Sequence, residues 1–179
     1  MSESSSTRDK IRLLRGLRAV REYLPDPVPE AVLDDIYEVA RWTGSARNLQ
    51  PWELVVVRER ATLDRLSQFE GYAAHLAGAP LGVVLVMDGA NEEYATYDGG
   101  RLAERIMLAA AAHGLGSCIG WWSKLGQDEV KRVLGIPADR IVRTVLAIGY
   151  PDEAARRALP KPSGFRKPIA EFVHQERFA

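Results

Sequence analysis

Apolar residues recur at helical spacing in two long segments of the chain. Between residues 29 and 42, apolar positions are separated by three or four residues: Val32, Leu33, Ile36, Val39 and Ala40. This spacing places them on one face of an amphipathic helix, which prolines precede and Gly44 follows. Residues 97–113 are rich in alanine and apolar over most of a helical surface. They predict a helix buried at the centre of the fold. Shorter helical patterns cover residues 9–16, 61–80 with breaks near Gly71 and at Pro80, and 126–134.

Runs of β-branched and aliphatic residues predict strands at 52–58, 81–88 and 143–151, and 116–122 is a short strand or a loop. Residues 81–88 are apolar almost throughout, which indicates a strand covered on both faces. Because helices interleave with these strands, we expect a layered arrangement with helices on both sides of a sheet. Residues 152–168 hold several prolines and cannot form one regular element. We expect this long tail to pack on a second subunit.

Composition narrows the class of protein. The 179 residues suit one domain, predicted over residues 9–179 after a disordered tail at 1–8. Lys and Arg equal Asp and Glu at 24 each, so neither nucleic acid nor a membrane is an expected partner. The polar amino terminus does not resemble a secretory signal. Cys118 is the only cysteine, which excludes an intrachain disulfide and fits the cytoplasm. The three histidines share no metal-ligand spacing, so no metal site is predicted.

Basic residues form the first candidate site. Arg18 and Arg21 follow the first predicted helix, and Arg166 with Lys167 lies in the tail. Together they could bind a phosphorylated ligand, because guanidinium groups form paired hydrogen bonds with phosphate. Taken alone, these residues are more typical of solvated surface charge.

The glycine-rich segment at residues 113–120 is a weaker candidate. A dinucleotide-binding fingerprint needs a strand before it and a helix after it, whereas here a helix precedes it. Cys118 is better interpreted as a small buried residue than as a nucleophile. Trp121 and Trp122 could equally wall a planar ligand or pack in a core.

A polar loop directly before the strand at 52–58 carries more hydrogen-bonding side chains than a turn needs. Its sequence, G-S-A-R-N-L-Q-P-W, contains Ser45, Arg47, Asn48 and Gln50. Read by itself, it is either part of a ligand site or a well-satisfied turn.

Several motifs together resemble the FMN-dependent nitroreductase family. They are L-R-A-V-R-E-Y with P-V-P-E-A-V-L, the loop motif S-x-x-N-x-Q-P-W, A-A-A-A-H-G-L-G-S-C-I-G, R-T-V-L-A-I-G-Y-P and F-R-K-P-I-A-E-F-V. In this order they span residues 17–173. The resemblance implies an α+β fold, a three-layer α-β-α sandwich with a mainly antiparallel mixed sheet. It also implies a homodimer with FMN at the subunit interface and a carboxy-terminal segment that extends over the partner subunit.

The resemblance also assigns cofactor-binding residues. Arg18, Ala19 and Arg21 would line FMN, with the Arg21 cation near the pyrimidine edge of the ring. Ser45, Asn48 and Gln50 would reach a cofactor shared with the other subunit. Gly120 and Trp121 match the region that offers a backbone N–H toward flavin N5, and Arg166 with Lys167 would hold the phosphate. Two polar family positions are here Leu17 and Ala19, Gly44 stands where the family usually has proline, and the I-G-W-W-S-K loop is unusual.

The function that the resemblance implies is an oxidoreductase in which NADH or NADPH is the transient electron donor to FMN. A small-molecule acceptor, such as a nitroaromatic or quinone, then takes the electrons in a ping-pong cycle, and no side chain acts as a catalytic nucleophile. Two alternatives keep the flavin: other chemistry on the same fold, such as reductive dehalogenation or oxidation, and a non-enzymatic FMN-binding redox protein.

Overall fold

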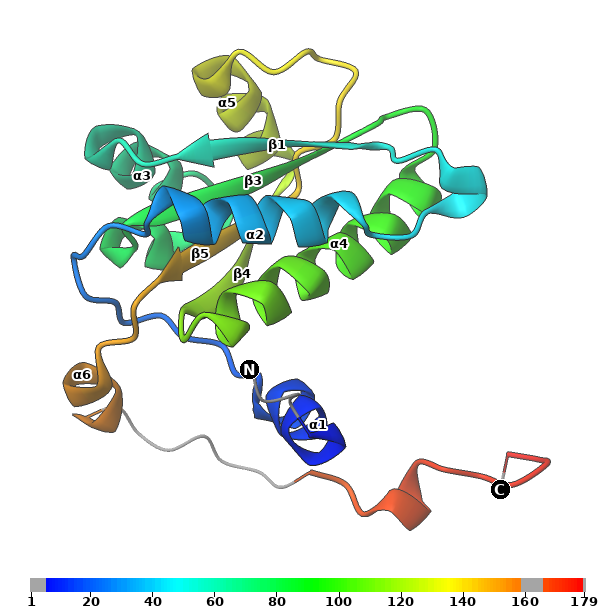
Figure 1. Ribbon diagram of the computed structural model, residues 1–179. Helices are drawn as coiled ribbons and strands as arrows, with labels where there is room; N and C mark the ends of the chain where they lie inside the picture. Colours follow the sequence, from blue (N-terminus) through cyan, green and yellow to red (C-terminus); the bar gives the residue numbers. More distant parts are fainter. Residues whose placement is uncertain (1–5, 159–165, 179) are drawn as a thin grey trace.

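A computed structural model of the chain describes residues 6–158 and 166–178 (Figure 1). Its helices and strands follow one another in the order α1 Thr7–Gly16, α2 Glu30–Arg41, β1 Trp52–Val57, α3 Arg60–Ser67, β2 Gly71–Tyr72, β3 Leu81–Met87, α4 Glu92–Ala112, β4 Gly116–Trp122, α5 Lys124–Leu134, β5 Thr144–Gly149 and α6 Glu153–Ala158. Single turns of 3-10 helix occur at η1 Ala46–Asn48, η2 Ala74–Gly78 and η3 Ile169–Glu171.

The strands form one five-stranded sheet in the order β1-β3-β5-β4-β2, and all four neighbouring pairs are antiparallel. A parallel pairing occurs as an isolated bridge between Ala19 and Ser117, beside the start of β4. The predicted mainly antiparallel mixed sheet is therefore confirmed, with its parallel component limited to this bridge.

Two hydrophobic cores lie on opposite faces of the sheet, because side chains of a strand alternate between its faces. Leu81, Val83, Leu85 and Met87 of β3 pack with α2 and α4. Val84 and Val86 pack in the second core with residues of α3, η2 and α5. The three-layer α-β-α arrangement expected from the sequence is thus confirmed, and Figure 1 shows α2 and α4 side by side on one face.

Several element boundaries differ from those expected. The central helix α4 begins at Glu92 rather than 97, because the Asn91 side chain accepts a hydrogen bond from the Tyr94 N–H at 3.0 Å and caps the helix. Within the segment expected to be irregular, α6 forms because the Asp152 carboxylate accepts from the N–H groups of Ala154 and Ala155 at 2.9 Å. The first helix starts at Thr7, two residues inside the tail predicted at 1–8.

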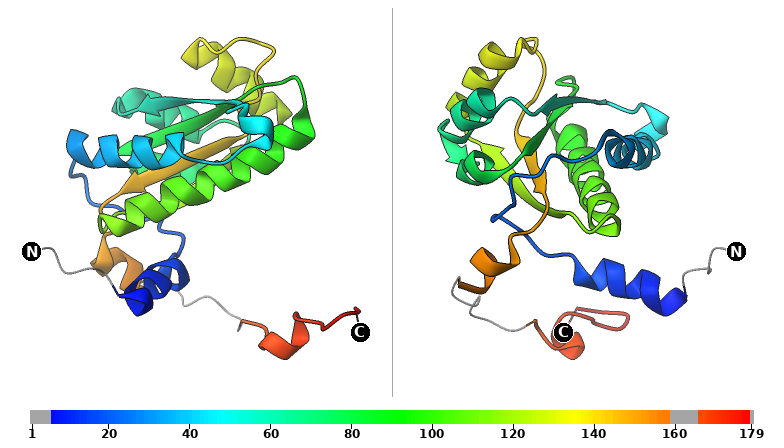
Figure 2. Two further views of the ribbon diagram at one scale, coloured as in Figure 1. Left: turned by 45° about the vertical axis from the view of Figure 1, so that its right-hand side comes forward. Right: turned by 60° about the vertical axis from the view of Figure 1, so that its left-hand side comes forward.

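Helix α1 and the carboxy-terminal residues 166–178, which are called the tail below, pack little against the rest of the described chain. No residue of α1 is buried, and its Ile11 and Leu14 are 47% and 53% exposed. In the tail, Ile169 and Phe172 are 72% and 59% exposed. Figure 2 shows both segments outside the sandwich. In the part of the chain that the structure describes, no helix is long and apolar enough to cross a membrane.

Candidate functional site

A large basic cleft lies between α1, the extended segment that follows it, α4 and the tail. Its volume is about 1260 Å³. Arg18, Ala19 and Arg166 all line it, so the structure brings together three of the predicted cofactor-binding residues. Three further arginines, Arg8, Arg12 and Arg15, line the same cleft from α1, with Glu104 and Met107 of α4 on the opposite side. The site is therefore strongly cationic, as a phosphate-binding site must be.

The segment that carries Arg18 and Arg21 is held against the edge of β4. The Val20 N–H donates to the Ser117 carbonyl oxygen at 2.9 Å, and the Val20 side chain is buried over Gly116. Because an extended chain alternates its side chains, burial of Val20 turns its two neighbours outward. Arg18 also closes the end of α1, where its Nη1 donates to the carbonyl oxygens of Arg15 and Leu17, both at 2.7 Å.

Farther along β4, Arg21 meets a small polar cluster. Burial lowers the pKa of His75, and the Arg21 charge lowers it further. Burial raises the pKa of the Cys118 thiol, which Arg21 offsets only in part. Both groups are therefore neutral near pH 7. Cys118 is 1% exposed, which confirms it as a small buried residue.

Gly120 lies beside this cluster with no room for a side chain. A Cβ there would lie 3.0 Å from the Tyr72 carbonyl oxygen and 3.1 Å from His75 Cε1. The neighbouring Trp122 N–H donates to the Arg143 carbonyl oxygen at 3.0 Å. Since N–H groups of a strand alternate in direction, the Gly120 N–H also points toward β5. At the outer edge of β4, Trp121 pairs with Tyr72 of β2, so an N–H offered to a ligand there would come from Ile119.

The two tryptophans differ in role because they lie on opposite faces of β4. Trp122 is fully buried, and its Nε1 donates to the Leu66 carbonyl oxygen at 3.1 Å. Trp121 is 43% exposed and pairs with Tyr72 of β2. Core packing thus explains Trp122, and Trp121 remains available to a ligand.

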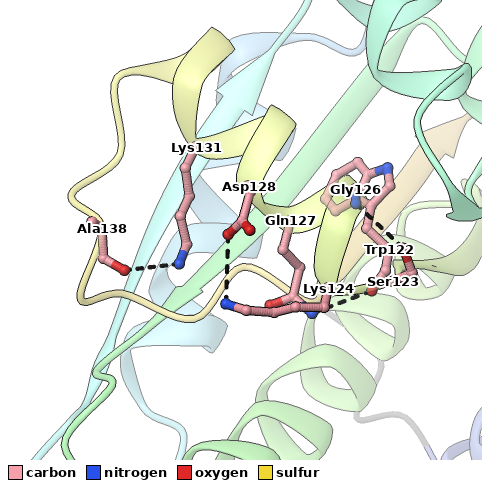
Figure 3. A network of polar contacts seen from close by, with 8 residues as sticks. All are labelled: Trp122, Ser123, Lys124, Gly126, Gln127, Asp128, Lys131 and Ala138. Carbon is pink, nitrogen blue, oxygen red and sulfur yellow. Dashed lines mark hydrogen bonds and ion pairs between the residues drawn. The ribbon is translucent and has the colours of Figure 1, made fainter.

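Polar contacts fix the end of β4 where it enters α5 (Figure 3). The Ser123 hydroxyl accepts from the Gly126 N–H at 3.3 Å and caps the helix, while Gln127 Nε2 donates to the Trp122 carbonyl oxygen at 3.3 Å. Deeper in the helix, the largely buried Lys131 ammonium donates to the Ala138 carbonyl oxygen at 2.9 Å. These contacts hold the strand that carries Gly120 and Trp121 in one position.

The polar loop at residues 44–50 lies apart from the basic cleft, beside the amino-terminal half of α4. The Ser45 hydroxyl accepts from the Gln50 N–H at 2.9 Å, and Gln50 Nε2 donates to the Asn48 carbonyl oxygen at 3.3 Å. Ser45 lines a separate cleft of about 350 Å³ with residues from the start of α4. Ser45, Asn48 and Gln50 therefore do not line the basic cleft of their own chain.

Backbone strain is concentrated in this loop. Arg47, Asn48 and Gln50 adopt φ values of 52°, 55° and 49°, a region that side chains other than glycine rarely occupy. Such strain is typical of ligand clamps. Beside this loop, a Cβ at Gly44 would lie 2.6 Å from Nη2 at the flexible end of the Arg101 side chain.

The remaining predicted residue, Lys167, is exposed in the tail and does not line the basic cleft. Residues missed by the sequence analysis are Arg8, Arg12 and Arg15, together with His75. The arginines carried a signal, because their spacing of four and three is helical. His75 carried none, since only the fold brings it beside β4.

Buried polar atoms test whether this arrangement fits a cofactor. Among residues 6–158 and 166–178, three buried side-chain atoms have no hydrogen-bond partner: Thr43 Oγ1, His75 Nε2 and Ser117 Oγ. Two of them lie beside the edge of β4, between the basic cleft and Gly120. Unpaired buried polar groups are uncommon in native structures, and a bound water or ligand is one of the explanations for them. The basic cleft suits a phosphate group, and the polar edge of β4 suits a ring with polar atoms. The residues present therefore fit a planar cofactor that carries a phosphate.

The chain is thus a three-layer α+β sandwich with an antiparallel sheet and a basic cleft beside its central helix. Comparison with known proteins gives the family. The model of the nitroreductase family matches residues 14–72 and 64–150, and the chain belongs to this family. It is therefore an oxidoreductase, as the sequence motifs predicted.

Individual relatives and solved structures agree. The chain is 31% identical over 175 residues to the NADH dehydrogenase of Thermus thermophilus, covering 76% of this chain and 83% of that protein. It is 28% identical to nitroreductase NfnB of Mycolicibacterium smegmatis, covering 94% and 92%. The structure of an FMN-dependent nitroreductase from Clostridium difficile has a TM-score of 0.82 and 27% identity, covering 94% and 99%. A nitroreductase-like protein from Streptococcus mutans, 20% identical with a TM-score of 0.81, shares the fold, covering 96% and 100%.

Proposed function

We propose that this protein is an FMN-dependent oxidoreductase that uses NADH or NADPH to reduce nitroaromatic, quinone or similar small acceptors. The observation that carries the proposal is that the basic cleft borders the start of β4. Ala19 lines the cleft with Arg18 and Arg166, and it is bridged to Ser117 of β4. Arg21 lies farther along the chain, close to Cys118 of the same strand. The similarity to enzymes named FMN-dependent nitroreductase and NADH dehydrogenase supports it.

Each part of the site would have a distinct role. Arg18 and Arg166 would hold the FMN phosphate through charge-assisted hydrogen bonds. Arg21 would place a positive charge where reduction of the ring adds negative charge, which favours the reduced state. Gly120 would act indirectly, because the absence of a side chain lets Tyr72 and His75 pack closely against β4. When bound, FMN supplies the hydride-transfer chemistry, so the protein needs no nucleophile.

We also propose a homodimer with each FMN at the subunit interface. Ser45 lies in a cleft with the amino-terminal half of α4 and not in the basic cleft of its own chain. In the proposed dimer, the loop with Ser45, Asn48 and Gln50 would instead contribute to the cofactor of the other subunit. The exposed apolar side chains of α1 and the tail support such an interface, because burying them in a partner is favourable. In this proposed dimer, the tail of each subunit crosses to the partner subunit. We also propose that the protein is cytoplasmic.

Anaerobic reduction tests the proposal directly. Protein reconstituted with FMN is mixed with NADH or NADPH, and the visible absorbance of oxidised flavin is followed. We expect the absorbance to bleach and to return when a nitroaromatic or a quinone is added. Bound flavin that neither nucleotide bleaches would instead indicate a non-enzymatic flavin-binding protein. A colourless protein that does not take up FMN would contradict every flavin-dependent function.

A further inference from the structure

Helix α1 presents a stripe of arginines to the basic cleft. Arg8, Arg12 and Arg15 are spaced by four and three residues, which places them along one face of the helix. All three line the cleft, together with Ile11 and Leu14 of the same helix. The stripe is additional to the two arginines, Arg18 and Arg166, that we assign to the FMN phosphate.

The charge of the cleft exceeds what one FMN phosphate neutralises. A phosphate monoester carries about two negative charges at pH 7, which Arg18 and Arg166 balance. Among the described residues, Glu104 is the acidic residue that lines the cleft, and Asp9 pairs with Arg12 at 3.3 Å. No carboxylate of the described chain lies within ion-pair distance of Arg8 or Arg15. Within residues 6–158 and 166–178, the guanidinium groups of Arg8 and Arg15 therefore have no ion-pair partner, and Glu104 is the acidic residue that shares the cleft with them.

The geometry separates these two cations along the helix. Seven residues divide Arg8 from Arg15, which corresponds to about 10 Å along the axis. Arg15 lies beside Arg18, at the end assigned to FMN, whereas Arg8 lies in the first turn of α1. The first turn also holds Asp9, whose carboxylate pairs with Arg12 and not with Arg8.

We propose that the Arg8 end of this stripe binds the extra phosphate on the adenosine ribose of NADPH, and that NADPH is the preferred electron donor. This inference rests on the proposed function, because it assigns a donor to the same site. The cleft volume of about 1260 Å³ exceeds the range of about 300–1,000 Å³ that is usual for one small ligand, which leaves space for a second nucleotide beside FMN.

Adenosine phosphates test the proposal without requiring turnover. FMN-loaded protein is titrated by calorimetry with adenosine 2′,5′-bisphosphate, adenosine 3′,5′-bisphosphate and adenosine 5′-monophosphate at fixed ionic strength. We expect the 2′,5′-bisphosphate to bind about tenfold more tightly than the monophosphate, as one charge-assisted contact provides. Adenosine 3′,5′-bisphosphate carries the phosphate pattern of coenzyme A instead of that of NADPH. If it bound more tightly than adenosine 2′,5′-bisphosphate, the proposal would be overturned.

Variants locate the site. Arg8→Ala should bring the affinities for the 2′,5′-bisphosphate and the monophosphate to within about threefold, and Arg8→Lys should restore part of the difference, because a point charge remains. Arg65→Ala makes the same charge change on the exposed surface of α3, outside the cleft, and should leave the difference intact. Equal binding of the two ligands by the unaltered protein, or an unchanged preference in Arg8→Ala, would refute the assignment.

Failure of this inference differs from failure of the proposed function. A protein that NADH and NADPH bleach with equal efficiency retains the function and loses the donor preference. A protein that holds no flavin, or whose flavin neither nucleotide bleaches, loses the function itself. If Arg8→Ala does not fold, the salt dependence of the unaltered protein replaces it. Raising the ionic strength should weaken binding of the 2′,5′-bisphosphate more than that of the 3′,5′ compound, since only the former would use the cationic stripe.

Discussion

Substitution of Gly116 by alanine tests how the segment with Arg18 and Arg21 is held in place. An added Cβ would lie 2.7 Å from Val20 Cβ, 2.7 Å from Cγ1 and 2.8 Å from Cγ2. Carbon atoms in contact lie about 3.5–4.0 Å apart, so Val20 must move by roughly 1 Å. That movement weakens the hydrogen bond from the Val20 N–H to the Ser117 carbonyl oxygen, now 2.9 Å long.

The expected loss of stability follows from these two effects. Forcing an extra carbon into a packed core costs about 1–3 kcal/mol. The weakened hydrogen bond adds about 1 kcal/mol. At about 2–4 °C per kcal/mol for a chain of this size, the melting temperature should fall by roughly 4–16 °C. FMN affinity should fall about tenfold if the displaced arginines lose about 1.4 kcal/mol of binding energy.

Thermal unfolding at one protein concentration, with and without FMN, measures both effects. Gly100→Ala is the matched control, because a Cβ there has no atom within 4 Å and alanine favours a helix. The double variant Gly116→Ala with Val20→Ala removes two of the three colliding carbons. It should therefore lose less stability than the sum of the single variants, by about 0.5–3 kcal/mol. Strict additivity, or an unchanged melting temperature for Gly116→Ala, would refute the reasoning.

Three further predictions concern the cofactor, the dimer and pH. Arg166→Ala should raise the dissociation constant of FMN about tenfold or more, because it removes a charge-assisted contact of about 1.5–3 kcal/mol. Fluorescence titration with free FMN measures this change, and an unchanged affinity would exclude Arg166 from the phosphate site. Deletion of residues 160–179 should convert the dimer to monomers in sedimentation, whereas a truncated protein that stayed dimeric and yellow would exclude a crossing tail. Burial lowers the pKa of His75 in the folded chain below its unfolded value of about 6.5. Just below that pH the unfolded chain therefore binds more protons than the folded chain. The free energy of unfolding should fall as the pH drops through that range. In His75→Gln this loss should be smaller when melting temperatures at pH 5.5 and 7.5 are compared, and identical pH profiles for the two proteins would contradict the assignment.

Much of the fold was predictable because its signals are local. The apolar run at 81–88 indicated a strand buried on both faces, and β3 indeed supplies both cores. The periodic helix at 29–42 became α2. Boundaries were less accurate where one capping side chain decides them, as Asn91 does for α4. The loop motif and the arginines identified the family, since their order along the chain is specific.

The candidate site was only partly predictable from the sequence. Arg18, Ala19 and Arg166 do share one cleft, as the resemblance implied. The motif alone could not show that Ser45 lies outside the basic cleft. Residues of α4 up to Arg101 line the cleft that contains Ser45, whereas Glu104 and Met107 line the basic cleft, so the two clefts use different parts of one helix. The roles of all ten predicted cofactor residues remain predictions until FMN binding is measured.

By itself, the sequence determined the class of fold, the family and the identity of the residues able to bind a phosphate. Periodicity predicted the helices, the strands and their layering. The resemblance of several motifs to the nitroreductase family implied the detailed fold and the phosphate-binding residues. Both signals depend on residues close together in the chain. Only the tertiary structure decided which residues meet. It placed His75 beside Gly120, buried Trp122 while exposing Trp121, and set the arginine stripe of α1 opposite α4. These arrangements arise from packing between distant segments, whose free energy depends on the assembled core and leaves no periodic signal in the chain.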